Sequence, residues 1–230
     1  MLAPELDNPF WSSLRTRHRD IAVGTGEVMR YPREFAPFLG VADADVDLVP
    51  AIDSLVAAGE SVYLLGVVPA VPEGWQLEAF RPLAQMVCTA PLEVIDGPEI
   101  IPLTQTHRAD VLALTGLVYP HYFRERTTEM GRYFGIYMPD ASGESRLAAI
   151  IGERLGTGAY TEMSAICTHP DFHGRGYARR LTAMLTNDTL ARGRTPFLHV
   201  SHENNRAKQL YEQIGFQHRR DIGFWALRRT

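Results

Sequence analysis

The sequence predicts an α/β protein with a mixed central sheet flanked by helices in its C-terminal half and a smaller α/β region in its N-terminal half. A clear order of strands and helices begins at residue 99, and a strand over 160–168 leads through a glycine-containing turn into a long helix. The polar stretch at 89–98, bracketed by prolines, is the best candidate for a boundary. We therefore divide the chain into regions 1–97 and 98–230.

Composition excludes several classes of protein. The 230 residues are 45% hydrophobic and 22% charged, as in soluble globular proteins. The net charge of −4, with scattered basic residues, argues against a nucleic-acid partner. Two cysteines, Cys88 and Cys167, cannot form a disulfide framework. No stretch approaches the roughly 18 apolar residues of a membrane span, and the first residues lack a signal-peptide core. We expect a cytoplasmic protein without a membrane partner.

The N-terminal region alternates turn-forming clusters with short apolar runs. We expect a helix over 48–58, closed by Gly59, and a buried strand over 61–68 that ends at Pro69. Another short strand is expected at 85–88. The region contains no glycine-containing turn at the start of a helix, so it resembles a degenerate α/β half.

The C-terminal region has a clearer order of elements. Strands are expected at 99–103, 134–138, 146–155, 160–168 and 197–200 and from Phe216 onward, with helices at 104–117, from the turn to about 191, and at 205–214. The first of these helices should bury Val111, Leu112, Leu114 and Leu117. The strands at 134–138 and 146–155 should form a hairpin across the turn between them.

The first motif is the segment that joins the strand over 160–168 to the following helix. Its residues are Ile166, Cys167, Thr168, His173, Gly174, Arg175, Gly176, Tyr177 and Ala178. Two glycines at the start of a helix let the backbone approach a bulky group, and they leave the first helical N–H groups free for an anion. The turn therefore predicts a phosphate-binding cradle. It lacks the Lys-Ser/Thr pair of a nucleotide-hydrolysing loop.

The second motif is the segment NNRAKQLYEQIGF at 204–216. Ala207, Leu210, Tyr211 and Ile214 share one face of a helix that ends at Gly215. Tyr211 is therefore turned inward, where its hydroxyl needs a polar partner. A buried core tyrosine is the structural alternative.

Together the two motifs resemble the GNAT superfamily of N-acetyltransferases. That family pairs a Gln/Arg-x-x-Gly-x-Gly/Ala turn with a later Asn-x-x-Ala-x-x-Leu-Tyr-x-x-x-Gly-Phe helix. The resemblance covers residues 98–230 and implies the mixed sheet of that family. One position departs from the pattern, because His173 stands where Gln or Arg is usual. Since backbone amides should hold the pyrophosphate, we expect this departure to affect affinity more than activity.

The resemblance implies acetyl-CoA as the acyl donor. The backbone of Ile166, Cys167 and Thr168 would pair with the pantetheine arm, and residues 173–178 would hold the pyrophosphate. Asn204 and Ala207 would also contact acetyl-CoA, and Tyr211 would lie near its sulfur. An amine would then attack the thioester directly, with Tyr211 as general acid and a backbone N–H near Ile166 stabilising the oxyanion.

A base must take a proton from the ammonium form of the acceptor, and Glu162 is the candidate, acting directly or through water. A solvent-facing strand carboxylate is its structural alternative. The paired histidines, His169 with His173 and His199 with His202, lack further ligands, so we expect no metal site. Cys167 has no evident base to activate it, which favours a structural thiol.

Three alternatives remain open at the level of the sequence. The chain could bind acyl-CoA as a sensor or scaffold without turnover, or it could transfer a larger acyl group. The acceptor could be a small-molecule amine or a peptide N-terminus. The loop at 119–129 and the N-terminal region should set acceptor specificity, but they contain no recognisable motif. A homo-oligomer is compatible with everything above.

Overall fold

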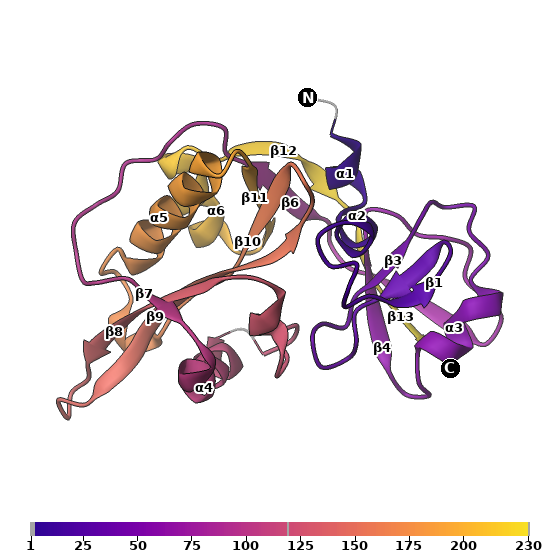
Figure 1. Ribbon diagram of the computed structural model, residues 1–230, viewed down its shortest axis with the longest axis horizontal. Coiled ribbons are helices and arrows are strands. Elements are labelled where there is room, and N and C mark those ends of the chain that lie inside the picture. Colours follow the sequence, from indigo (N-terminus) through magenta and orange to yellow (C-terminus); the bar gives the residue numbers. More distant parts are fainter. Residues whose placement is uncertain (1–2, 119, 230) are drawn as a thin grey trace.

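The computed structural model describes residues 3–118 and 120–229, and a seven-stranded mixed sheet forms its centre (Figure 1). The strand order is β12-β6-β11-β10-β9-β8-β7, and only β10 and β11 pair in parallel. The bounds are β6 Leu83–Val87, β7 Ile101–Leu103, β8 Tyr133–Pro139, β9 Ser145–Gly156, β10 Tyr160–Thr168, β11 Thr195–Ser201 and β12 Gln217–Ile222. The predicted mixed sheet flanked by helices is confirmed.

Helices cover both faces of this sheet. Helices α5 (Tyr177–Ala191) and α6 (Asn205–Ile214) lie on one face, and α4 (Arg108–Val118) lies on the other (Figure 1). Neighbouring residues of β9 show the two faces, since Ile151 packs into the cluster of α5 and Ile150 packs against α4. Three short 3-10 helices span Gln105–His107, Thr127–Met130 and Pro170–Phe172.

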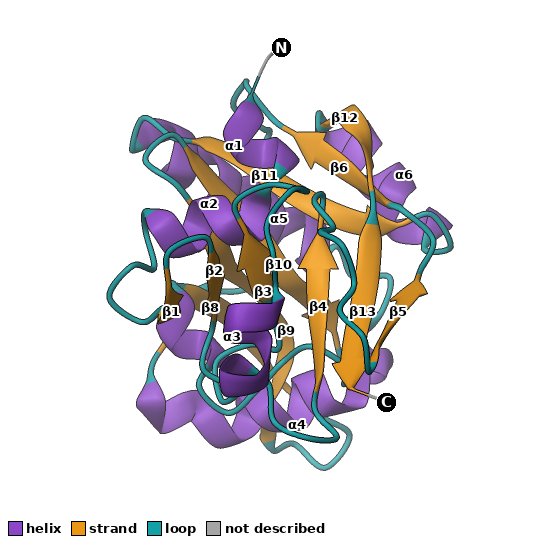
Figure 2. Ribbon diagram, turned by 90° about the vertical axis from the view of Figure 1, so that its right-hand side faces the viewer, coloured by secondary structure: helices purple, strands orange, loops and turns teal. Residues whose placement is uncertain are grey.

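The N-terminal region contains two small antiparallel sheets. The first has the order β1-β2-β3, and the second has the order β4-β13-β5 (Figure 2). Their bounds are β1 Val23–Thr25, β2 Val28–Arg30, β3 Leu39–Val41, β4 Ser61–Leu65, β5 Trp75–Ala79 and β13 Phe224–Arg229, and the helices are α1 Pro4–Asp7, α2 Pro9–Arg15 and α3 Val49–Leu55. The second sheet therefore takes its middle strand from the C-terminus of the chain.

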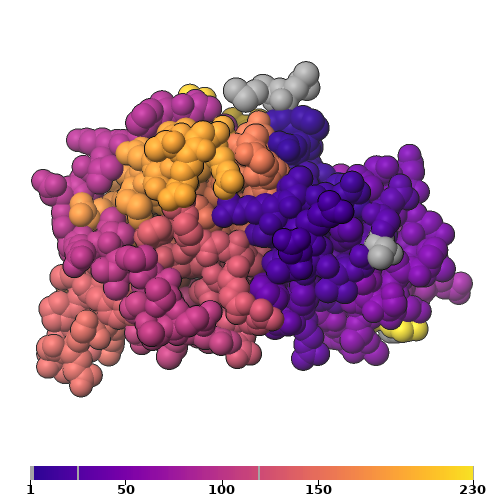
Figure 3. Space-filling view, viewed as in Figure 1, coloured from indigo at the N-terminus to yellow at the C-terminus, as the bar shows by residue number. Residues whose placement is uncertain are grey.

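Strands cross the boundary expected after residue 97 in both directions. Strand β6 precedes that boundary but pairs with β11 and β12 of the large sheet. Strand β13 follows it but pairs with β4 and β5. In the space-filling view the indigo residues of the N-terminal region pack against the magenta and orange residues that follow (Figure 3). The two regions are thus joined by shared sheets as well as by a linker.

Several expected elements differ in length from the observed ones. The helix expected over 48–58 ends at Leu55, because Val56 is already extended. The strand expected over 61–68 ends at Leu65, since Gly66 has a φ of +87°. Leu117, expected to be buried, is 57% exposed, because it lies at the end of α4 beyond the edge of the core. Across the described residues, no helix has the length and apolar character needed to cross a membrane.

Candidate active site

The strands β10 and β11 separate in the middle of the large sheet. They pair from Tyr160↔Thr195 to Glu162↔Phe197, although β10 continues to Thr168 and β11 to Ser201. Beyond the last pair the register of β10 against β9 shifts between Ser164 and Cys167. Ala165 lies in this shift with a φ of +51°, and it is the one non-glycine residue with positive φ within 3–118 and 120–229. Bulges and strained backbone of this kind gather at functional sites.

Two cavities border the place where the strands separate. The larger, of about 720 Å³, lies between β10, β11 and the N-terminal region, and the smaller, of about 520 Å³, lies between α6 and the turn before α5. Both volumes are in the range of small-ligand sites. The residues that line both cavities are Val118, Ile166, Cys167, Asn204, Ala207 and Tyr211. The two cavities therefore meet at residues predicted to contact acetyl-CoA.

The turn before α5 has the conformation that the glycine motif predicts. Gly174 and Gly176 adopt φ values of +78° and +77°, and Gly176 is the N-cap of α5 without a capping side chain. The first N–H groups of α5 are thus left for a ligand, and the helix dipole favours an anion there. The side chain of His173 donates a hydrogen bond from Nε2 to the carbonyl oxygen of Thr168, at 2.9 Å. His173 therefore closes the turn onto the end of β10.

Basic side chains surround the smaller cavity. Arg175, Arg179 and Arg206 line it together with the predicted turn residues His173, Gly174, Gly176, Tyr177 and Ala178, and Thr168 at the end of β10. Arg179 also pairs with Glu93 at 3.2 Å, and Arg175 lies over the ring of Phe172 at 5.2 Å. Free helical N–H groups and arginine side chains at one cavity both favour the binding of a phosphate group.

Helix α6 places Asn204 and Tyr211 at the junction of the cavities. The side chain of Asn204 accepts a hydrogen bond from the N–H of Ala207, at 3.1 Å, and so caps the helix. Tyr211 lies on the inward face, is 6% exposed, and borders both cavities. The inward orientation expected from the helical spacing is therefore observed.

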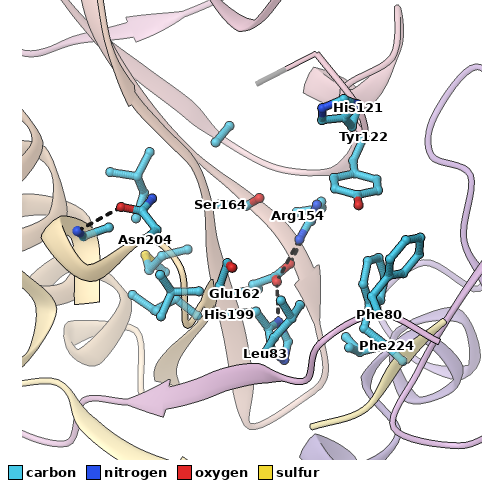
Figure 4. A pocket seen from close by; sticks show the side chains of 18 of the residues that line it. Phe80, Leu83, His121, Tyr122, Arg154, Glu162, Ser164, His199, Asn204 and Phe224 are labelled. Atoms are coloured by element: carbon cyan, nitrogen blue, oxygen red, sulfur yellow. Dashed lines mark hydrogen bonds and ion pairs between the residues drawn. The ribbon is translucent and has the colours of Figure 1, made fainter. Parts of the chain in front are cut away.

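Glu162 lies in the larger cavity, where it is bound by two side chains (Figure 4). Arg154 donates from Nε and Nη2 to the two carboxylate oxygens, each at 3.0 Å, and His199 Nδ1 donates to Oε1 at 2.8 Å. Burial alone would raise the pKa of Glu162, but the charge of Arg154 and the hydrogen bonds from His199 and Arg154 lower it to about 2. Glu162 is therefore a carboxylate at neutral pH, and it is only 1% exposed.

Cys167 borders both cavities but is not an activated nucleophile. Burial raises the pKa of its thiol to about 12, so the thiolate is scarce at neutral pH. This agrees with the expectation of a structural thiol. Within the described part of the chain, no group of three or more His, Cys, Asp or Glu side chains is arranged to hold a metal ion.

Several residues of the site were not predicted from the sequence. Arg154 and His199 contact Glu162 from the neighbouring strands β9 and β11 (Figure 4). Ser164, two residues after Glu162 on β10, also lines the larger cavity. Arg154 and Glu162 lie on the strands expected over 146–155 and 160–168, which follow each other in the sequence, so pairing of these two strands as neighbours could have placed Arg154 near Glu162. His199 gave no such signal, because its pairing depends on a parallel strand reached through α5.

Comparisons with known proteins agree on one family. A family model described as FR47-like protein matches residues 135–225. The fold is similar to a protein from Novosphingobium aromaticivorans DSM 12444 assigned to the acetyltransferases of the GNAT family, with 30% identity, 98% of each chain covered and a TM-score of 0.85. It is also similar to a GCN5-related N-acetyltransferase from Kribbella flavida, with 16% identity, 94% of this chain and 92% of that chain covered and a TM-score of 0.59.

A third similar structure is an acetyltransferase from the GNAT family from Colwellia psychrerythraea, with 10% identity, 100% of this chain and 98% of that chain covered and a TM-score of 0.53. A search of the curated proteins gave no match. The likenesses at 10% and 16% identity concern the fold alone, whereas the 30% identity extends over nearly the whole of both chains. The chain belongs to the GNAT family.

Proposed function

We propose that the protein transfers an acetyl group from acetyl-CoA to a primary amine by direct attack in a ternary complex. The observation that carries this proposal is the meeting of the two cavities at Ile166, Asn204 and Tyr211. A donor with a phosphate end fits the smaller cavity, and an acceptor fits the larger one. Both could be present together, so no covalent intermediate on the protein is needed.

The donor's fit rests on residues of this chain. The N–H groups at the start of α5 and the arginines of the smaller cavity would hold the pyrophosphate. Beyond Glu162 the backbone of β10 is not paired with β11. The backbone groups of 166–168 on that side can therefore hydrogen-bond to the amide groups of an extended pantetheine arm. Bound acetyl-CoA supplies an activated thioester whose sulfur leaves as a thiol.

The residues at the junction would handle the protons and the developing charge. A backbone N–H at the bulge near Ile166 would stabilise negative charge on the carbonyl oxygen. Tyr211 would donate its phenolic proton to the leaving sulfur. The amine nitrogen forms the new C–N bond and the C–S bond breaks. The proton that the nitrogen then loses restores the Tyr211 hydroxyl through solvent, which leaves an amide and a free thiol.

Glu162 would act on the acceptor's ammonium group. A carboxylate with a pKa near 2 attracts and orients an ammonium but is a weak proton acceptor. We therefore assign the transfer to a water molecule held by Glu162, which passes the proton to solvent. Loss of this proton frees the lone pair of the amine for attack, and Glu162 stays a carboxylate paired with Arg154.

The proposal is tested by following free CoA thiol in a mixture of protein, acetyl-CoA and a panel of primary amines. We expect thiol release to depend on the amine and to equal the amount of N-acetylated product measured by mass spectrometry. Tight binding of acetyl-CoA without product from any amine would contradict the proposal and support a non-catalytic acyl-CoA-binding protein.

A further inference from the structure

The end of the larger cavity farthest from α6 is formed by aromatic side chains. Phe80, Tyr122 and Phe224 line it, and they come from the turn after β5, the loop after α4 and β13. The ring centroids of Phe80 and Tyr122 lie 5.4 Å and 5.7 Å from that of Phe224. Tyr63 packs behind them, stacked on Phe224 at 5.4 Å. We call Phe80, Tyr122 and Phe224 the aromatic wall.

The aromatic wall presents apolar surface to the cavity. Phe80 is 37% exposed, although it lies among other aromatic rings and lines a cavity. The neighbouring lining residues Phe10, Phe38 and Leu65 are also apolar and are buried. A partly exposed ring in such surroundings gains most from a ligand with a flat apolar surface.

The cavity has a fixed order from one end to the other. In Figure 4, Asn204 lies on one side, Glu162, Ser164 and His199 lie in the middle, and the aromatic wall lies on the far side. Arg154 stands between the middle group and Tyr122 (Figure 4). A ligand whose amine is held at Glu162 would therefore extend its other end toward Phe80 and Phe224.

The charges of the larger cavity leave no evident place for an anionic tail. Arg154 is engaged by both oxygens of Glu162. Arg81, at the rim, pairs with Glu203 at 3.3 Å, and both side chains are largely exposed. Among the described lining residues, each arginine thus faces a carboxylate. An uncharged tail suits this lining better than a carboxylate or phosphate.

We propose that the acceptor is a small primary amine joined by a short linker to a flat, uncharged aromatic group, which stacks on the aromatic wall. This inference rests on the proposed acetyl transfer. The cavity of about 720 Å³ has the size of a small-molecule site. The amine end lies beside Glu162, Ser164 and His199 in the middle of the cavity, and the aromatic wall selects the other end.

The test uses the full chain, acetyl-CoA and three amines: 2-phenylethylamine, n-propylamine and 4-(2-aminoethyl)benzoate. We expect kcat/KM for 2-phenylethylamine to exceed the other two by roughly tenfold or more, because ring stacking and apolar burial favour it. Phe80→Ala should raise KM for 2-phenylethylamine and reduce its advantage over n-propylamine about tenfold. Phe80→Tyr keeps the ring and should retain that advantage. KM for acetyl-CoA is the internal control for folding.

A binding measurement separates this inference from the proposed function. Calorimetry with 2-phenylethylamine and the protein saturated with CoA should show binding that Phe80→Ala weakens. If this binding occurs but no amine is acetylated, the aromatic site stands and the proposed function fails. If amines are acetylated with kcat/KM values within threefold of one another, or if an alanine-starting tetrapeptide is preferred, the function stands and the aromatic site is wrong. If 2-phenylethylamine neither binds to the CoA-saturated protein nor is preferred as a substrate, the aromatic site is also wrong.

Discussion

The side chain of Tyr211 borders both cavities, and its ring also packs in the hydrophobic core. Tyr211→Phe keeps the ring and its packing against Phe216, whose ring centroid lies 6.0 Å from that of Tyr211. General acid catalysis contributes about 10²–10⁴-fold, so we expect kcat to fall by that range. CoA affinity should change by only about 1 kcal/mol. The measurement is kcat beside a thermal melt, and a lower melting temperature with nearly normal kcat would mark Tyr211 as structural.

The ion pair between Glu162 and Arg154 should also stabilise the fold. Glu162→Gln leaves Arg154, whose side chain is 11% exposed, without its charged partner. Breaking a buried ion pair typically costs about 3–5 kcal/mol, so the free energy of unfolding at pH 7 should fall by roughly that amount. Urea unfolding of the two proteins measures the difference.

The same substitution has a defined pH dependence. Because the pKa of Glu162 is lowered from an ordinary 4.5 to about 2, its stabilisation is present above pH 4.5 and is lost as the pH falls toward 2. The difference between wild type and Glu162→Gln should therefore be smaller at pH 3 than at pH 7. An equal difference at both pH values would show that the ion pair is not its cause.

At the scale of single elements, the start of α5 is the feature on which the proposed binding of acetyl-CoA depends. Gly176→Asp would place a side chain and a negative charge beside the N–H groups meant for phosphate. We expect CoA affinity, measured by calorimetry, to fall roughly tenfold or more. Gly193→Asp is the matched control, since Gly193 has a similar φ of +73° in open space beyond the other end of the same helix. Equal affinities in both variants would mean that the phosphate site lies elsewhere.

The elements that carry the site were the ones that the sequence predicted best. Strand 160–168 and helix 205–214 have the expected bounds, because their apolar spacing and their Gly215 and Thr168 ends are local features. The strands β1, β2, β3 and β5 were missed, since each has only three to five residues and β5 pairs with β13 at the end of the chain. The aromatic wall was missed for the same reason, because its members come from distant segments brought together by the pairing of β13 with β4 and β5.

At the scale of the whole molecule, the two regions should unfold together. Strand β6 is a middle strand of the large sheet, and β13 is the middle strand of a sheet built otherwise from the N-terminal region. Neither region can lose its sheet without disturbing the other. We expect a single calorimetric transition whose van't Hoff and calorimetric enthalpies agree. Two separate transitions would show that residues 1–97 and 98–230 fold as independent units.

In the proposed reaction, the arrangement of the whole molecule determines how donor and acceptor meet. The large sheet supplies the separated strands β10 and β11, and the N-terminal region with β13 closes the larger cavity from the other side. The most direct measurement is therefore a structure of the protein with acetyl-CoA. We expect the pyrophosphate on the N–H groups of 173–178, the arm along 166–168, and the sulfur beside Tyr211, facing Glu162. A pyrophosphate bound in the N-terminal region, or a sulfur remote from Tyr211, would contradict the account.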